Sequence, residues 1–331
     1  MVYCNADNVK EKINVLRGIA IFSVVCAHTA ISTNVNEISI KCVEIMQIFG
    51  CGGVGLFFVL SGYFFAENTD DIQVFWRKKL YTLIIPWFVT GTIVYLYTEI
   101  RKTGVSLRGW IQWICGIRTY LWYMMVLFIL FVVFKVANRC KILLKIIPII
   151  SIVSFCSYKI LYPYLWSWGG DYLNFFNWQL FFWVGYQINT NDKLKQSISN
   201  IINKKILFIG AYLICLSVLI ILGIDMHYRT PFYIIYELLF IFSALACSEL
   251  LIKNFFIKRI GRHSFSIYLI HMPVAGVINY IVSILGDMWM FVLLKPIVVL
   301  FCVELLIILY TKCISKTGNY ENILKRILGL R

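Results

Sequence analysis

Two side chains that can carry charge lie inside one apolar stretch near the start of the chain. Residues 13–31 read INVLRGIAIFSVVCAHTAI, with Arg17 near one end and His28 near the other. Ionisable groups inside a membrane span are costly and by default mark a functional site. An imidazole takes up or releases a proton near neutral pH, so His28 is a candidate for acid–base or nucleophilic chemistry.

The spacing between Arg17 and His28 places both residues on one face of a helix. Successive residues turn by about 100°, so the two directions agree to within about 20°, and the two residues are roughly 16 Å apart along the axis. A cation at the membrane edge and an imidazole deeper on the same stripe indicate the two ends of a binding channel. The alternative is that Arg17 extends to the headgroups and His28 is a hydrogen-bonded core residue.

A second candidate segment is GCGGVGLFFVLSGYFF, residues 50–65. Its glycines allow close backbone approach or a non-helical turn, which is tolerated at membrane depth inside protein or beside a cavity. Ser61 lies among aromatic residues of this segment and is a candidate to line the site. The alternative is a face of small residues that serves only helix packing.

A third candidate is the basic run Arg77-Lys78-Lys79, at the expected cytoplasmic end of a span. These cations could hold the phosphates of a soluble cofactor. The alternative is an ordinary positive anchor of a membrane helix.

The fourth candidate segment is HSFSIYLIHMP, residues 263–273. Tyr268 and His271 are three residues apart, so they share a helix face and are candidates to line the site. Glu237, Glu304 and Lys295 are further ionisable residues in apolar runs, and some of these can pair internally without a functional role.

The composition indicates the elements that position these residues. The chain has 331 residues, 60% of them hydrophobic and 14% charged, with a mean hydropathy of +0.80. Soluble domains are about 45–50% apolar and about 25% charged, so we expect an all-α polytopic membrane bundle. No linker or low-complexity tract divides residues 1–331, which predicts a single membrane-embedded domain. We expect about ten spans, near 13–31, 48–66, 81–99, 119–137, 143–161, 175–189, 205–223, 231–252, 263–284 and 289–311.

Lysines and arginines gather in alternate loops of this layout, which predicts that both termini are cytoplasmic. The loop at residues 100–118 departs from the pattern because it places several basic residues on the outer side. The net charge of +15 follows from the positive loops, so we expect no nucleic-acid partner. The 11 cysteines form no CxxC pair or Cys/His cluster with metal spacing, so we expect no metal cofactor.

Taken in order, these segments resemble the membrane-bound acyltransferase 3 family, bacterial acyltransferases that modify cell-surface glycans. Five motifs carry the resemblance across residues 13–273: Arg17 followed by His28 after ten intervening residues, Phe57 to Tyr63, the basic run before Ile85-Pro86, Leu121-Trp122-Tyr123, and Ser266 to His271.

The resemblance implies transfer of an acyl group, usually acetyl, from cytoplasmic acyl-CoA to a sugar hydroxyl of an envelope glycan or its lipid-linked precursor. The family's Arg/Lys-x10-His motif falls on Arg17 and His28. The family's Arg-x-x-Arg motif is incomplete, because Tyr81 or Thr82 stands where the second arginine is expected. Lys is a point charge and Tyr carries none, so a bidentate clamp on phosphate is not complete here.

On this interpretation, Arg17 and the run Arg77-Lys78-Lys79 bind CoA phosphates, and the pantetheine arm extends toward His28. His28 would be the general base for the acceptor hydroxyl or a transient acyl carrier. Ser61, Tyr268 and His271 would line or orient the site. The expected partners are acyl-CoA, a glycan or lipid-linked sugar, and the lipid bilayer of the bacterial cytoplasmic membrane.

Two other functions remain open at this stage. A transporter or flippase of a lipid-linked sugar would also need intramembrane charges, and it predicts internal symmetry that the sequence does not display. A non-catalytic membrane sensor would tolerate the loss of His28 as long as its ligand still bound.

Overall fold

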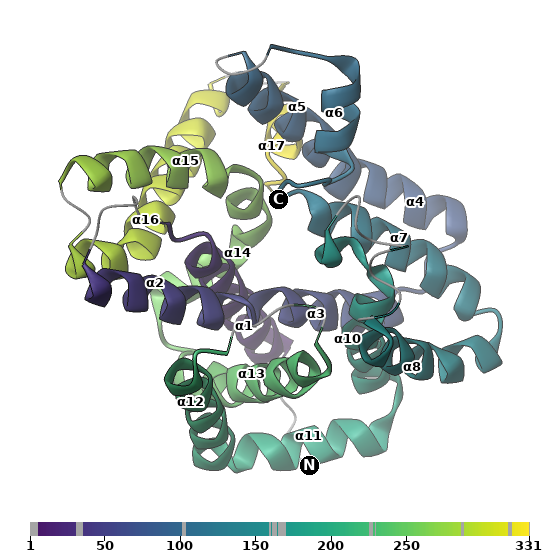
Figure 1. The fold of residues 1–331 in the computed structure, drawn as a ribbon. Coiled ribbons are helices and arrows are strands. Elements are labelled where there is room, and N and C mark those ends of the chain that lie inside the picture. Colours follow the sequence, from purple (N-terminus) through teal and green to yellow (C-terminus); the bar gives the residue numbers. More distant parts are fainter. Residues whose placement is uncertain are drawn as a thin grey trace. The chain divides into compact units, whose positions relative to one another are not determined.

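The computed structural model describes residues 6–30, 36–100, 104–158, 160, 164, 170–224, 228, 230–285, 288–316 and 320–330. Within these residues the regular structure is entirely helical, with no strand (Figure 1). The α-helices are α1 (Ala6–Ala27), α2 (Glu37–Gly50), α3 (Gly53–Glu67), α4 (Ile72–Lys79), α5 (Ile85–Glu99), α6 (Leu107–Ile114), α7 (Trp122–Ala137), α8 (Lys141–Cys156), α10 (Phe175–Thr190), α11 (Asp192–Asn203), α12 (Lys205–Leu222), α13 (Pro231–Leu250), α14 (Phe255–Arg262), α15 (Ser264–Ile284), α16 (Trp289–Ile314) and α17 (Glu321–Ile327). A π-helical turn η1 (Leu80–Ile84) joins α4 to α5, and a 3₁₀ turn η2 (Asp171–Leu173) precedes α10.

The helical membrane architecture expected from the composition is confirmed. Each of the ten expected spans overlaps a helix. Six segments among the described residues are long and apolar enough to cross a membrane: Glu37–Glu67, Ile72–Glu99, Lys205–Leu222, Pro231–Leu250, Ser264–Ile284 and Trp289–Ile314. Trp122–Ala137 is a shorter apolar helix. The number ten therefore stays a prediction.

The glycine-rich segment contains the non-helical turn that its composition allowed. The expected span at residues 48–66 is two helices, because α2 ends at Gly50 and α3 begins at Gly53, with a turn at Cys51 and Gly52 between them. The side chain of Asn36 caps α2 by accepting from the amide of Ser39, which satisfies one free N–H of the first turn.

The described chain divides into two compact units that interleave in sequence. The first unit takes residues 1–56, 200–226 and 236–331, and the second takes residues 57–199 and 227–235. Each unit thus combines distant parts of the chain. The expectation of one domain over residues 1–331 stays a prediction.

The first unit is built on α1, which packs against α14, α2, α16 and α15. Val15, Ile21 and Val24 of α1 are buried in these contacts. Apolar side chains on every side of a helix are typical of a helix enclosed by others. The segment with Arg17 and His28 is therefore part of the protein core of this unit.

The second unit has an aromatic core around α3, α7 and α10. Phe58 of α3 and Trp178 of α10 have ring centroids 5.2 Å apart, and Phe134 of α7 lies 4.4 Å from Phe182. A Cβ at Gly62 would collide with the carbonyl oxygen of Phe182, so the backbones of α3 and α10 touch at this point. The glycine in the expected small-residue face thus serves close helix packing.

Candidate active site

His28 is the first residue after α1, one position beyond the end of the helix at Ala27. The amide of His28 donates to the carbonyl of Val25 at 3.2 Å, and the amide of Thr29 donates to Cys26 at 3.0 Å, so the last turn is tightened. The sequence predicted a span that continued to residue 31, of which position 31 lies outside the described residues. The helix stops earlier, and the carbonyls of Thr29 and Ala30 accept hydrogen bonds from side chains of other helices.

Two side chains from other helices bind the backbone that follows His28. Gln47 Nε2 of α2 donates to the carbonyl of Thr29 at 3.1 Å. Lys295 Nζ of α16 donates to the carbonyl of Ala30 at 2.5 Å, and Lys295 is only 2% exposed. Backbone carbonyls outside regular structure need partners of this kind when they are withdrawn from water. The sequence identified Lys295 as an ionisable residue in an apolar run but gave it no role.

The imidazole of His28 lies beside the imidazole of His271. Their ring centroids are 5.2 Å apart and the planes are inclined by 44°. His271 is fully buried in α15, and its Nδ1 lies 2.7 Å from the carbonyl oxygen of Tyr268. A carbonyl oxygen only accepts hydrogen bonds, so Nδ1 carries the proton and, in the neutral ring, Nε2 carries the lone pair. The expected face shared by Tyr268 and His271 thus lies next to His28.

Arg17 is half-buried on α1, at the place where α1 meets α14. A Cβ at the neighbouring Gly18 would collide with the carbonyl oxygen of Ile257, and a Cβ at Gly261 would collide with the carbonyl oxygen of Asn14. The two backbones touch, and this contact brings the basic helix α14 alongside the Arg17 end of α1.

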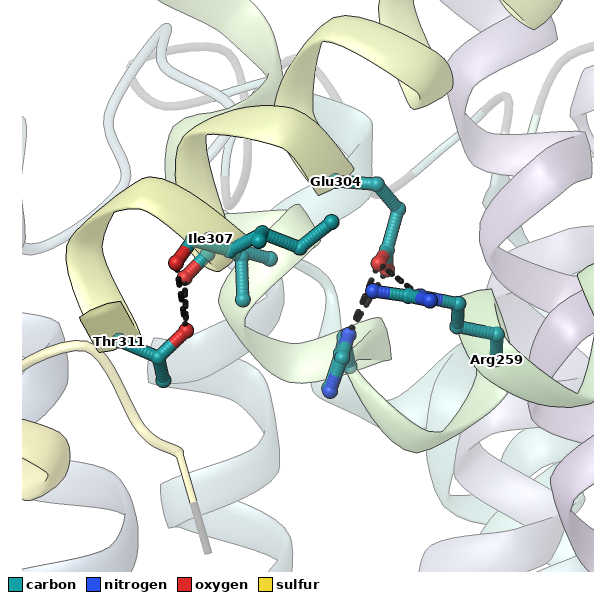
Figure 2. Close-up of polar contacts among 6 residues, drawn as sticks. Arg259, Glu304, Ile307 and Thr311 are labelled. Atoms are coloured by element: carbon teal, nitrogen blue, oxygen red, sulfur yellow. Dashed lines mark hydrogen bonds and ion pairs between the residues drawn. The ribbon is translucent and has the colours of Figure 1, made fainter.

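A buried carboxylate of α16 binds α14 and the residue that links α14 to α15 (Figure 2). Glu304 is 5% exposed and accepts from Arg259 Nε at 2.9 Å, and His263 Nδ1 lies 2.9 Å from its other oxygen. Further along α16, Thr311 donates to carbonyls of its own helix, at Ile307 and Ile308. Glu304 is thus one of the intramembrane ionisable groups that pair internally, and its partners offset the cost of burying its charge.

The basic run of the second unit is divided among three environments. Arg77 is exposed, and Lys78 forms an ion pair with Asp70 at 2.7 Å. The hydrogen bond from Lys78 is the first cause that holds the pKa of the Asp70 carboxyl below its usual value. Lys79 lies over two aromatic rings, with its Nζ 4.1 Å from the centroid of Phe131 and 5.3 Å from that of Phe75. The three adjacent cations are therefore not equivalent.

Lys135 of α7 adds a cation that the sequence analysis did not include. Its Nζ lies 4.2 Å from the ring centroid of Phe75, the ring that Lys79 also approaches. Two ammonium groups at one aromatic ring form a local positive centre, which is attracted to the ring face. Only the fold could place Lys135 here, because it is far from Lys79 in the sequence.

Ser61 belongs to the second unit and lies near Tyr123. Its hydroxyl oxygen is 3.4 Å from the hydroxyl oxygen of Tyr123, and either group can be the donor. The structure thus brings Ser61 together with Tyr123 of the Leu121-Trp122-Tyr123 motif.

Comparison with known families decides the class of this chain. The acyltransferase 3 family, whose model is described as an acyltransferase domain, matches residues 10–310 of the 331. The chain belongs to the acyltransferase 3 family. No curated protein and no solved structure matches it.

This membership makes the chain a membrane-embedded acyltransferase and confirms the resemblance read from the motifs. Within the acyltransferase, the first unit brings together His28, Tyr268 and His271, and it also contains Arg17. Ser61 and the run Arg77-Lys78-Lys79 belong to the second unit. The roles assigned to these residues from the sequence stay predictions.

Candidate metal ligands in the acyltransferase are sparse. Over the described ranges, no group of three or more His, Cys, Asp or Glu side chains could hold a metal ion.

Proposed function

We propose that this acyltransferase moves an acyl group, usually acetyl, from cytoplasmic acyl-CoA to a sugar hydroxyl of an envelope glycan or its lipid-linked precursor. The observation that supports the proposal most strongly is the pair of imidazoles of His28 and His271 at the end of α1. The pair includes the histidine of the family's Arg/Lys-x10-His motif, and the chain belongs to that family.

In the proposed reaction His28 is the general base. A ring nitrogen takes the proton of the acceptor hydroxyl while the hydroxyl oxygen attacks the thioester carbonyl carbon. The carbon–sulfur bond then breaks, and the departing CoA thiolate takes the proton from the imidazolium. Transfer through an acyl group carried on His28 leads to the same products and stays an open alternative.

His271 and Tyr268 orient this chemistry in the proposal. Because His271 Nδ1 donates to the Tyr268 carbonyl, the neutral ring presents Nε2 as its accepting nitrogen. A neutral imidazole close to His28 can hold a polar group of the acceptor or a proton in transit. The close ring contact also limits the rotation of His28.

The cations of each unit provide the basis for binding the anionic donor. In the first unit the candidate is Arg17, which lies beside the basic helix α14. In the second unit the candidates are Arg77, Lys78 and Lys79, to which we add Lys135. Lys135 supplies a positive charge from α7, whereas the incomplete Arg-x-x-Arg motif has Tyr81 or Thr82 in place of its second cation.

The test of the proposed function is an acyl-transfer assay with the purified full chain in liposomes, using labelled acetyl-CoA and envelope glycans of the host. We expect label to appear on glycan or lipid-linked sugar. Mass spectrometry of surface glycans from cells with and without the gene should show the matching loss of an acetyl substituent. Movement of a lipid-linked sugar across the liposome membrane without acyl transfer would instead indicate a flippase.

A further inference from the structure

We infer that Lys295 is a positioning residue of this enzyme, which holds the backbone after α1 so that the imidazole of His28 stays beside His271. The inference rests on the proposed catalytic role of His28. It assigns a role in the site to a residue that lies on another helix and outside the family motifs.

The segment after α1 is held from two sides. Consecutive carbonyls, those of Thr29 and Ala30, accept from Gln47 of α2 and Lys295 of α16. Both carbonyls follow His28 directly, so these bonds fix the backbone that carries the imidazole. All of these residues belong to the first unit.

The residue type at position 295 is informative because a buried lysine is expensive. Lys295 is 2% exposed within a span whose surroundings are mostly apolar. A neutral amide is sufficient to satisfy a carbonyl here, as Gln47 does for Thr29. An ammonium group makes this hydrogen bond charge-assisted. The hydrogen bond from Lys295 is therefore a stronger anchor than a hydrogen bond from a neutral donor.

The anchor matters because His28 has few other restraints. Within the described part of the chain its imidazole forms no hydrogen bond, and its ring contact is with His271. The backbone therefore sets the direction of the imidazole. Catalysis is sensitive to such placement, since a displacement of about 1 Å can cost on the order of 100-fold in rate.

The test replaces Lys295 with methionine, which keeps a long apolar side chain and removes the donor. In the full chain we expect Lys295→Met to lower kcat by roughly 10- to 100-fold, with the KM for acetyl-CoA unchanged. Lys295→Arg, which keeps a charged donor, should recover part of the turnover. The matched control is Lys312→Met, on the same helix but exposed, which should keep normal turnover.

A second measurement reports on His28 itself. Diethyl pyrocarbonate modifies imidazoles, and peptide mass spectrometry gives its rate at each histidine. In Lys295→Met we expect His28 to react faster relative to His263, the internal reference, because the released backbone exposes the ring. An unchanged ratio would overturn the inference, even if turnover fell.

Double mutants separate positioning from a general structural effect. If Lys295 acts through His28, the pair His28→Asn and Lys295→Met should be no less active than His28→Asn alone. Losses that multiply would contradict the inference, as would a Lys295→Met protein that is less stable but turns over normally per folded molecule. Normal turnover by His28→Asn would refute the proposed catalytic role of His28 instead, and the reactivity ratio would still test the anchor.

Discussion

At the scale of single residues, the proposed site depends on the imidazole of His28, whose neighbours differ from those of an ordinary core histidine. His28 is half-buried and lies against another imidazole, whereas Nδ1 of His263 lies 2.9 Å from a carboxylate oxygen of Glu304. A histidine kept only for packing would be expected to have a fixed hydrogen-bond partner. In the described part of the chain the ring nitrogens of His28 form no hydrogen bond, which agrees with the proposed role of the ring in binding substrate.

Replacing His28 by asparagine should abolish most turnover without unfolding the protein. Asparagine keeps part of the size and polarity but has neither the basicity nor the nucleophilicity of imidazole. We expect His28→Asn to fold, to bind acetyl-CoA and to lose roughly 100-fold or more in turnover. The measurement is acyl transfer per mole of folded protein, beside a binding assay for acetyl-CoA.

The matched control is His263→Asn, the same substitution outside the imidazole pair, which should retain turnover per folded molecule. If His28 is only a packed core residue, His28→Asn will instead lose thermal stability and keep its activity per folded molecule. That result would direct attention to His271.

Neutralising Arg17 should weaken donor binding. Arg17→Gln removes a half-buried cation beside the basic helix α14, where screening by salt is limited. Lys325→Gln is the control, because Lys325 pairs with Glu321 on the terminal helix α17. Titration calorimetry with acetyl-CoA should show a larger rise in Kd for Arg17→Gln. Equal small effects would favour the reading in which Arg17 only reaches the headgroups.

At the scale of helices, close backbone contact decides how the second unit holds together. A Cβ at Gly185 of α10 would collide with the carbonyl oxygen of Val59 in α3, reciprocal to the contact of Gly62 with α10. These two positions exclude any side chain, so the register between α3 and α10 is fixed. Ser61 lies between Val59 and Gly62, and its position depends on that register.

A pair of glycine substitutions tests this contact. Gly185→Ala should lower the free energy of unfolding by about 1–3 kcal/mol, because the added methyl group forces the backbones apart. Gly210→Ala in α12 has open space around the new Cβ and should be neutral or stabilising by up to about 1 kcal/mol. Thermal unfolding in detergent measures both. Equal stability of the two variants would mean that α3 and α10 do not touch at Gly185.

At the scale of the whole molecule, the order of basic loops predicts orientation. Lysine and arginine in short loops favour the cytoplasmic side of a membrane. This asymmetry is the basis for assigning the donor side, since acyl-CoA, the proposed donor, is cytoplasmic. Family membership makes the chain a membrane enzyme. Its orientation in the membrane is predicted from the loop charges.

Cysteine labelling tests the orientation directly. In a background without other cysteines, a membrane-impermeant reagent added outside intact cells should label a cysteine at Asp171 and not one at Lys204. Permeabilised cells, in which both positions should react, provide the control. Labelling in the reverse sense would refute the cytoplasmic placement of the termini and of the donor-binding cations with it.

The sequence by itself determined the class of protein and the positions of most helices. A long apolar run with few charges crosses a membrane as a helix, because a helix satisfies all backbone hydrogen bonds within the segment. The helical bundle therefore follows from composition. The order of motifs was sufficient to identify the family, because each motif is local. The placement of Arg17 and His28 on one helical stretch also followed from the local sequence, except that α1 ends at Ala27, one residue before His28.

Only the tertiary structure decided which distant residues meet. Lys295 binds the carbonyl of Ala30, 265 positions away, and His271 lies against His28. In the second unit, Lys135 approaches the same ring as Lys79. Hydrophobic periodicity identifies the buried face of a helix but leaves its neighbour, register and crossing angle undefined. Those quantities depend on where backbones can touch and where helices end, and both are properties of the packed chain.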